Sequence, residues 1–177
     1  MIELSCYKNE WKTIFNDFRV EVLHLAKGLV LDVQHIGSTS IAGVKAKDII
    51  DTQIAIKSFD QMGLLKPILE SLGFNCIDTI PQDHVPFHDF DYVEPGWEKR
   101  LFKGKYKEQN FNIHIRVYNS LNWKFALNFK NYLSENELAR YAFMQFKERL
   151  ALADVSIEEY CMIKDSVIDL LSLQFRD

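Results

Sequence analysis

The sequence has few of the residues that stabilise small secreted or zinc-dependent proteins. It contains only three cysteines, Cys6, Cys76 and Cys161, which lie far apart and form no Cys-x-x-Cys pair. An odd number of widely spaced cysteines argues against a disulfide framework and against a structural zinc site. This cysteine usage favours a reducing compartment, and we predict a cytoplasmic protein.

Long apolar runs are also missing. No stretch approaches the ~20 apolar residues that a membrane-spanning helix needs, and residues 1–5 lack the basic region and apolar core that begin a signal peptide. The net charge of −4 leaves no excess of basic residues, which a general nucleic-acid-binding protein normally carries. We therefore expect no membrane partner and no general nucleic-acid binding.

The sequence does contain enough apolar material for a substantial core. Its 177 residues are 47% hydrophobic and 13% aromatic, as is typical of globular proteins. A chain of this length buries about two-thirds of the surface that it exposes when unfolded. Because there is no internal repeat or low-complexity segment, residues 1–177 are predicted to form one domain.

Alternating apolar and polar residues predict the strands of a sheet. The predicted strands cover the ranges 30–36, 49–56, 98–103 and 109–118, with a short candidate at 74–79. A turn around Gly104 and Lys105 is expected to join the last two strands. Between residues 80 and 96 no regular pattern exists, and loops of this length in compact domains are often functional or mobile.

Helical spacing of apolar residues predicts the remaining elements. The predicted helices cover 9–27, 58–72, 120–133, 134–152 and 156–173. Pro67 lies inside the second helix, so that helix is expected to be kinked or divided. Ser120 is a candidate cap for the third helix, and capping boxes starting at Ser134 and Ser156 are expected to begin the last two. The acidic residues of the last helix, including Asp165 and Asp169, are predicted to face solvent.

The stretch after the first strand is a candidate anion site. Strand 30–36 leads into Gly37, Ser38, Thr39 and Ser40. Glycine readily adopts a positive φ, and three consecutive hydroxyl residues with their backbone N–H groups can donate to a phosphate. Lys45 and Lys47 follow closely and match the charge of such a ligand.

The next strand places polar groups beside this turn. Because strand side chains alternate between faces, Asp51 and Gln53 share one face of strand 49–56, and the isoleucines Ile50 and Ile54 share the other. In strand 109–118, His114 and Arg116 are expected on the matching polar face; a guanidinium can bind phosphate bidentately. We predict that Ser38, Asp51, Gln53, His114 and Arg116 line one concave site on the open face of the sheet.

The run HIGSTSIAGVKAKDIID resembles the signature of the GrpB (UPF0157) family, which is placed in the nucleotidyltransferase superfamily. Further matching motifs cover nearly the whole chain: Tyr7-x-x-x-Trp11, Asn112-Ile113-His114-Ile115, Phe129-Lys130-Asn131-Tyr132-Leu133 and Tyr141…Lys147…Leu150. Two features depart from the family. Gln53 stands where a second acid of an Asp-x-Asp pair belongs, and Lys130, Asn131 and Ser134 replace the usual residues of Phe-Arg-Asp-Tyr-Leu-Arg.

The resemblance implies an α/β fold, with a small mixed β-sheet of nucleotidyltransferase type, helices packed on one face and a C-terminal helical cluster. It also implies an NTP such as ATP as substrate, with Mg²⁺ or Mn²⁺ held by Asp51. In that reading Asp51 and His114 are the catalytic candidates, since His114 lies near the position of the superfamily's third carboxylate. Gly37, Ser38, Thr39, Ser40, Lys47, Gln53 and Arg116 would bind the nucleotide phosphates. His114 is equally well explained as a satisfied histidine on a half-covered sheet.

Three functions are open at this point. The first is transfer of a nucleotidyl group to a small-molecule or protein acceptor. The second is binding of a nucleotide or other phosphorylated ligand without turnover, since Gln53 brings no negative charge to a cation. The third is an interaction module. Restoring a carboxylate at position 53 is expected to tighten divalent-cation binding. The acceptor, the nucleotide and the oligomeric state have no signal in the sequence.

The irregular segment raises one further possibility. His84, His88, Asp89 and Asp91 have side chains that suit zinc or a similar ion. However, polar residues between prolines are ordinary for an exposed loop, and no second ligand pair has a characteristic spacing. We favour the loop interpretation over a metal site.

Overall fold

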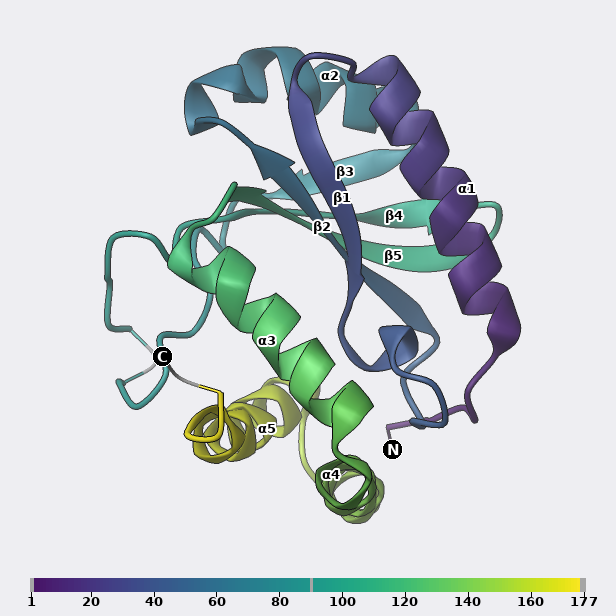
Figure 1. Cartoon of the computed structure of the whole chain (residues 1–177), viewed down its shortest axis with the longest axis vertical. Coiled ribbons are helices and arrows are strands. Elements are labelled where there is room, and N and C mark those ends of the chain that lie inside the picture. The colour runs from purple at the N-terminus through teal and green to yellow at the C-terminus, as the bar shows by residue number, and fades with distance from the viewer. Residues whose placement is uncertain (1, 90, 176–177) are drawn as a thin grey trace.

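A five-stranded mixed sheet forms the centre of the protein (Figure 1). The computed structural model describes residues 2–89 and 91–175. Its strands are β1 (Val30–Ile36), β2 (Ile49–Ile56), β3 (Phe74–Ile77), β4 (Arg100–Tyr106) and β5 (Gln109–Val117). The predicted mixed sheet is confirmed, and the bounds of β1 and β2 agree with those predicted.

The order of the strands in the sheet is β1-β2-β5-β4-β3. The central pair, β2 and β5, is parallel, and all other neighbouring strands are antiparallel. In the register of the central pair Asp51 lies opposite Asn112, and Gln53 lies opposite His114. The two polar patterns seen in the sequence therefore meet side by side on one face.

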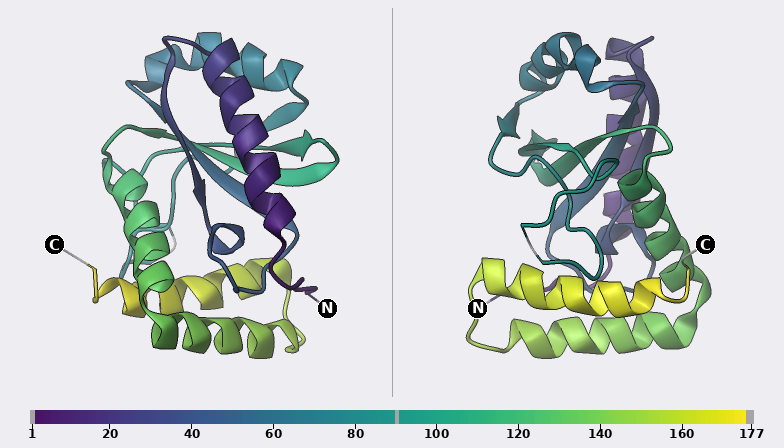
Figure 2. Two further views of the ribbon diagram at one scale, coloured as in Figure 1. Left: turned by 45° about the vertical axis from the view of Figure 1, so that its right-hand side comes forward. Right: turned by 90° about the vertical axis from the view of Figure 1, so that its left-hand side faces the viewer.

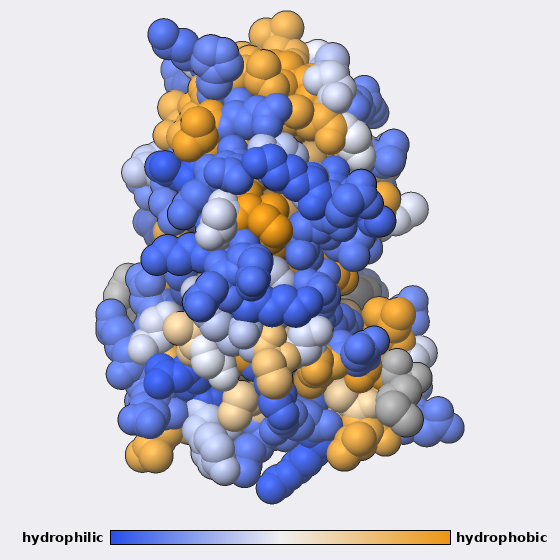
Figure 3. Space-filling view, turned by 90° about the vertical axis from the view of Figure 1, so that its right-hand side faces the viewer, coloured by the Kyte–Doolittle hydropathy of each residue, from blue (hydrophilic) through white to orange (hydrophobic). Residues whose placement is uncertain are grey.

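The other face carries the main hydrophobic core. Ile50, Ile54, Ile113 and Ile115 are completely buried, as strand alternation predicts. They pack in one cluster with helices α1 (Asn9–Leu25) and α2 (Met62–Ser71). The side of the molecule that carries α1 is mainly hydrophilic, with separate small apolar patches (Figure 3), because the apolar stripe of α1 faces the sheet.

The C-terminal third forms a separate helical cluster, as predicted. Helix α3 (Leu121–Glu135) contacts β1 and β5, and the antiparallel helices α4 (Glu137–Ala151) and α5 (Ile157–Ser172) lie side by side beyond one end of the sheet (Figure 2). Ile41 and Val44, just after the hydroxyl turn, join the apolar cluster of these helices. This packing brings the C-terminal helices close to the turn. Among the described residues, no helix has the length and apolar character needed to cross a membrane.

The predicted turn around Gly104 and Lys105 is wrong, because β4 continues to Tyr106. The chain reverses at Lys107 and Glu108, which both have positive φ. Such a two-residue turn usually contains glycine or asparagine, so the sequence gives no signal for it. Gly104 is needed instead inside the strand: a Cβ there would lie 2.4 Å from the Gly73 carbonyl oxygen.

Two starts of C-terminal helices also differ from the prediction. Asn136, not Ser134, is the N-cap of α4 and accepts from the Ala139 N–H. The Ser134 hydroxyl instead donates to the Lys130 carbonyl, since α3 continues to Glu135. Ser120 precedes α3, but its hydroxyl bonds to Val117 and Asn122 rather than capping the helix.

The remaining helix predictions agree with the structure apart from details. The capping box at Ser156 is confirmed. Lys8, not Asn9, is the N-cap of α1, and no side chain caps that end. The predicted division of helix 58–72 occurs before Met62, where a 3-10 turn over Phe59–Gln61 ends, while Pro67 lies within α2.

Candidate functional site

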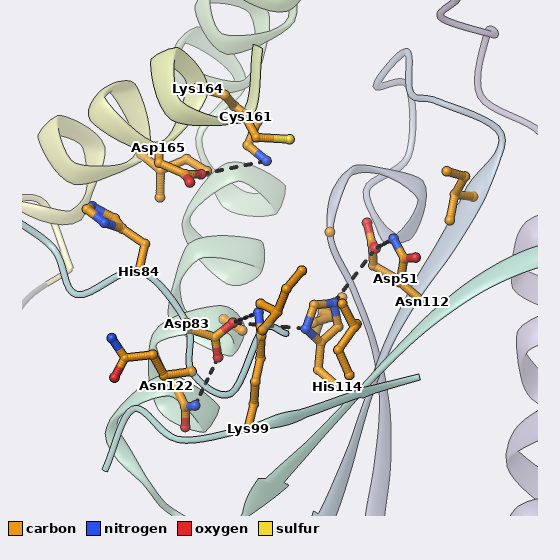
Figure 4. Close-up of a pocket in the computed structure, with 18 of the residues that line it drawn as sticks. Asp51, Asp83, His84, Lys99, Asn112, His114, Asn122, Cys161, Lys164 and Asp165 are labelled. Atoms are coloured by element: carbon orange, nitrogen blue, oxygen red, sulfur yellow. Dashed lines mark hydrogen bonds and ion pairs between the residues drawn. The ribbon is translucent and has the colours of Figure 1, made fainter. Parts of the chain in front are cut away.

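A large cavity, of about 1390 Å³, opens on the polar face of the sheet. Its walls come from β2, β4 and β5, from the hydroxyl turn, from the loop before β4, and from the C-terminal helices (Figure 4). The basic residues of the lining are Lys47, Lys99, Arg100, Lys103, Lys105, Arg116, Lys147 and Lys164. The acidic residues are Asp51, Asp83, Asp91, Glu98, Asp165 and Asp169. The lining is thus more basic than acidic, although the whole chain carries a net charge of −4.

The hydroxyl turn begins at Gly37, which brings the backbone against Asp51. Gly37 has φ +67, and a Cβ at this position would lie only 2.6 Å from Asp51 Oδ2. Only glycine allows both this φ and this approach. The turn then continues as a short 3-10 segment, Ser38–Ser40, so that Ser38 and Asp51 both line the cavity.

The three hydroxyl groups of the turn have different partners. The Ser38 hydroxyl accepts a hydrogen bond of 2.8 Å from Lys147 Nζ. Thr39 is buried, and its Oγ1 lies 3.0 Å from His35 Nε2. The Ser40 hydroxyl donates to the Gly37 carbonyl. Of the three, Ser38 therefore presents its hydroxyl to a charged group on the wall of the cavity.

Lys147 is a buried cation that reaches this turn from α4. Only 4% of the residue is exposed, and its Nζ donates to Ser38 Oγ and, at 2.7 Å, to the Lys45 carbonyl. Both partners are neutral oxygens. Burial, and then the nearby Lys164 and Lys47, lower the pKa of Lys147 to about 7, although Asp51 opposes this shift.

Asp51 and His114 lie on the same face of the sheet, as predicted. Asp51 Oδ1 accepts a hydrogen bond of 2.9 Å from the Asn112 amide and lies 3.9 Å from His114 Nε2. Burial raises the pKa of Asp51, but His114 and Asn112 outweigh it, and the net pKa is below its ordinary value. Burial also lowers the pKa of His114, which keeps the imidazole neutral at pH 7.

Asp83 is a second carboxylate on the other side of His114. It comes from the loop before β4, and its Oδ1 lies 4.0 Å from His114 Nδ1. Lys99 Nζ contacts the same oxygen at 2.7 Å. Arg116 Nε and Asn122 Nδ2 each donate to Oδ2 at 2.9 Å. Burial raises the pKa of Asp83, but the neighbouring Arg116 and Lys99 lower it more strongly. The net pKa lies far below its ordinary value.

The predicted site is brought together except for one member. Ser38, Asp51, His114 and Arg116 line the cavity, but Gln53 does not. Gln53 is completely buried: its Oε1 accepts from Arg116 Nη1, and its Nε2 lies 3.4 Å from the Trp123 carbonyl of α3. Gly37, Thr39 and Lys47 also line the cavity, and Lys47 Nζ lies 4.5 Å from the centre of the Tyr160 ring. Ser40 is not among the lining residues.

Helix α5 contributes groups that the sequence analysis assigns to solvent. Asp165 is half-buried beside Lys164, and Asp169 is buried. The Asp169 carboxylate lies 3.0 Å from His84 Nε2 and accepts from the Phe87 N–H. The predicted solvent-facing position of these two acids is therefore wrong, because the loop before β4 packs on that side of the helix.

The loop histidines serve different contacts rather than one centre. His84 pairs with Asp169, whereas the His88 ring stacks on Tyr92 at 4.0 Å and its Nδ1 lies 3.0 Å from the Pro86 carbonyl. Asp89 and Asp91 are exposed. His84 and His88 therefore have separate contacts within this segment.

The family resemblance implies a Mg²⁺ or Mn²⁺ site at Asp51, which requires further oxygen ligands beside that carboxylate. Among the described residues, no three His, Cys, Asp or Glu side chains form a group that could hold a metal ion. Asp83 is saturated by Lys99, Arg116 and Asn122, and Gln53 has no charge. Asp51 remains as one carboxylate, and Lys164 and Lys147 already act on it electrostatically. These residues do not fit a paired-carboxylate site for Mg²⁺ or Mn²⁺.

Asp83, Lys147 and Lys164 are among the lining residues to which the sequence alone assigns no role. Lys147 does carry a local signal, since it lies at helical spacing among Phe143, Phe146 and Leu150 on the apolar side of α4. A lysine on such a stripe is rarely fully buried without a reason. Asp83 and Lys164 have no comparable signal.

Comparisons with known proteins agree with this architecture. A family model described as "GrpB protein" matches residues 1–172. A dephospho-CoA kinase of Mycobacterium tuberculosis (strain H37Rv) is 28% identical over 171 residues, which cover 90% of this chain and 41% of the kinase. The chain thus spans less than half the length of that relative.

Two solved structures have the same type of fold. The conserved protein GrpB from Enterococcus faecalis is 24% identical, with a TM-score of 0.75 over 97% of this chain and 98% of its own. Cid1, described as having RNA terminal uridylyl transferase activity, is 13% identical, with a TM-score of 0.50 over 81% of this chain and 40% of its own. The predicted nucleotidyltransferase-type fold is therefore confirmed.

Proposed function

This chain belongs to the GrpB family and has a nucleotidyltransferase-type fold, and we propose that it binds a nucleotide or related phosphorylated small molecule in the cavity on the open face of its sheet. The observation that carries this proposal is the environment of Lys147. Its ammonium group is buried against the hydroxyl turn and contacts a hydroxyl and a carbonyl, with no carboxylate in hydrogen-bond contact among the described residues.

A buried charge is costly unless an opposite charge compensates it. The depressed pKa of Lys147 expresses this cost. A phosphate beside Ser38 would supply the opposite charge, and it would accept hydrogen bonds from the ammonium group and the hydroxyl. Lys47 and Lys164 line the same part of the cavity and favour an anion there.

A binding screen tests this proposal. Isothermal titration of the four common NTPs into the wild-type protein is expected to show binding of at least one. The Lys147→Met variant is expected to weaken that binding by ~tenfold or more, since a hydrogen bond to a charged group contributes about 1.5–3 kcal/mol. Lys12→Met is the matched control, because Lys12 is exposed on α1 and does not line the cavity. If no NTP binds, the interaction-module function is favoured.

Nucleotidyl transfer is the second candidate, favoured by the position of Asp51 and His114 beside the turn. In such a reaction an acceptor hydroxyl attacks the α-phosphorus, the bond to pyrophosphate breaks, and the hydroxyl proton passes to a base. His114 is neutral at pH 7 and lies next to the cavity, so it is the candidate base. Release of pyrophosphate from the bound NTP with candidate acceptors, lost in His114→Gln, is the measurement that checks this function.

A further inference from the structure

The guanidinium group of Arg116 lies between Gln53 and Asp83, two side chains that stand where a metal site beside Asp51 would need further ligands. Its Nη1 donates to Gln53 Oε1, on the strand position two residues after Asp51. Its Nε and Nη2 both lie 2.9 Å from Asp83 Oδ2. A fixed positive charge of the protein therefore stands next to the position where the superfamily pattern expects a second acid.

The second carboxylate of this region is fully engaged by protein cations. Asp83 contacts Lys99 as well as Arg116, and both basic residues are buried. Figure 4 shows Lys99 and His114 on one side of Asp83, toward its Oδ1, whereas Asn122 points at its Oδ2. Two cations around one carboxylate leave a surplus of positive charge, which disfavours the binding of a divalent cation.

Asp51, the other carboxylate of this region, is also near positive charges of the protein. His114 and Asn112 lower the pKa of Asp51 most, and Lys164, which also pairs with Asp165 at 3.7 Å, adds a smaller contribution; Lys147 interacts with Asp51 as well. A divalent cation bound at Asp51 would lie near both ammonium groups and would be repelled by them. A phosphate group, in contrast, would be attracted by both and by the surplus charge at Arg116.

We infer that this cavity binds the phosphate groups of its ligand through fixed cations of the protein, Lys147 and Lys164 with Arg116 at the inner end, and that binding needs no divalent metal ion. The inference rests on the proposed function, because it concerns the same cavity and the same class of ligand. It makes the side chains of the protein, rather than Mg²⁺, the groups that neutralise the phosphate charge. In this respect the protein departs from the metal-dependent pattern implied by its fold.

The test compares NTP binding in excess EDTA with binding in excess Mg²⁺, by isothermal titration of each of the four common NTPs. For each NTP that binds, we expect the two dissociation constants to differ by less than ~tenfold. A loss of affinity of ~tenfold or more in EDTA overturns the inference but leaves the proposed function standing. Absence of binding under both conditions overturns both.

Variants identify the groups that replace the metal ion. Lys164→Met and Lys147→Met are expected to weaken binding in EDTA and in Mg²⁺ by the same factor, whereas Lys12→Met changes neither. Lys164 is only half-buried, so its variant is suited to the test if Lys147→Met does not fold. If both lysine variants keep full affinity in EDTA, the fixed cations do not bind the phosphates, and the inference fails.

Discussion

Gly37 and Asp51 are in such close contact that no other residue fits at position 37: a Cβ there would lie 2.6 Å from Oδ2 and 2.9 Å from Cβ of Asp51. The contact places the hydroxyl turn directly against β2, because no side chain at position 37 separates the turn from the Asp51 carboxylate. It also explains why Ser38 and Asp51 line the same cavity.

Gly37→Ala is therefore expected to destabilise the protein more than an alanine at another glycine of positive φ. Gly28 is the matched control, since it has φ +83 but an added methyl group there would have nothing within 4 Å. Gly28→Ala should cost about 1–2 kcal/mol from backbone strain, and Gly37→Ala about 1–3 kcal/mol more from the steric clash. Urea denaturation measures both, and equal costs would contradict the close contact.

Asp83 is expected to be the most sensitive charged residue of the cavity for stability. Asp83→Asn leaves Lys99 and Arg116 buried without their carboxylate, and breaking a buried ion pair costs about 3–5 kcal/mol. Asp17→Asn is the control, because the Asp17–Lys107 pair is exposed and such pairs contribute only about 0–1 kcal/mol. Similar free energies of unfolding for the two variants would show that Asp83 does not hold the loop to the sheet.

The sheet could be predicted well because its signals are local. Ile50 and Ile54 alternate with Asp51 and Gln53 within one strand, and this alternation alone assigns both faces. The turn at Lys107 could not be predicted, because it uses positive φ without glycine or asparagine. There the pairing of whole strands outweighs the preference of single residues.

The site could be predicted only in part, because half of it depends on contacts between distant parts of the chain. Asp51 and His114 follow from two strand patterns and the parallel register. The Lys147–Ser38 contact joins residues 109 positions apart, and the Arg116–Asp83 contact joins residues 33 positions apart. Such contacts depend on how α4 and the loop pack: the helical spacing of Lys147 indicates that it is buried, but not which groups it contacts.

The stability of the protein is expected to fall between pH 6.5 and 4. Burial, then Lys130, lower the pKa of His35 from 6.5 to about 4, although Asp51 opposes the shift. The unfolded chain binds the proton more readily than the folded one in this range, so stability is complete above pH 6.5 and is lost as the pH falls. The shift corresponds to roughly 3 kcal/mol.

Denaturant unfolding at several pH values measures this dependence, and His35→Gln is the informative variant. It removes the titrating group but keeps a side chain that can bond to Thr39. The slope of the free energy of unfolding against pH should become shallower between pH 6.5 and 4. The pH dependence that remains should reflect His114, whose pKa is lowered as well. An unchanged slope would show that His35 is not the group responsible.

Ligand affinity is expected to fall as the pH rises above about 7. A bound phosphate favours protonated Lys147 and so raises its pKa above the value of about 7 in the free protein. Binding is therefore strongest below that value and weakens by up to ~tenfold per pH unit above it, until the pKa of the complex is reached. Lys147→Arg keeps its charge at all these pH values and should remove the dependence. Nucleotide titrations of both proteins at pH 6.5 and 8.5 give the comparison.

Gln53→Asp is expected to leave divalent-cation binding unchanged, in contrast to the expectation from the strand pattern alone. In the structure position 53 is completely buried and faces the Arg116 guanidinium, so a new carboxylate would bind Arg116 rather than a metal ion. Calorimetric Mn²⁺ titrations of the wild type, Gln53→Asp and Asp51→Asn, each with ATP present, should give the same isotherms. The free energy of unfolding is a second readout. In Gln53→Asp the new ion pair with Arg116 should compensate part of the cost of burying the charge. Gln53→Leu leaves Arg116 without this partner and should be less stable than Gln53→Asp. Tighter Mn²⁺ binding by Gln53→Asp, lost again in the double variant with Asp51→Asn, would mean that the two positions do form a metal site and that Arg116 moves aside to admit the ion.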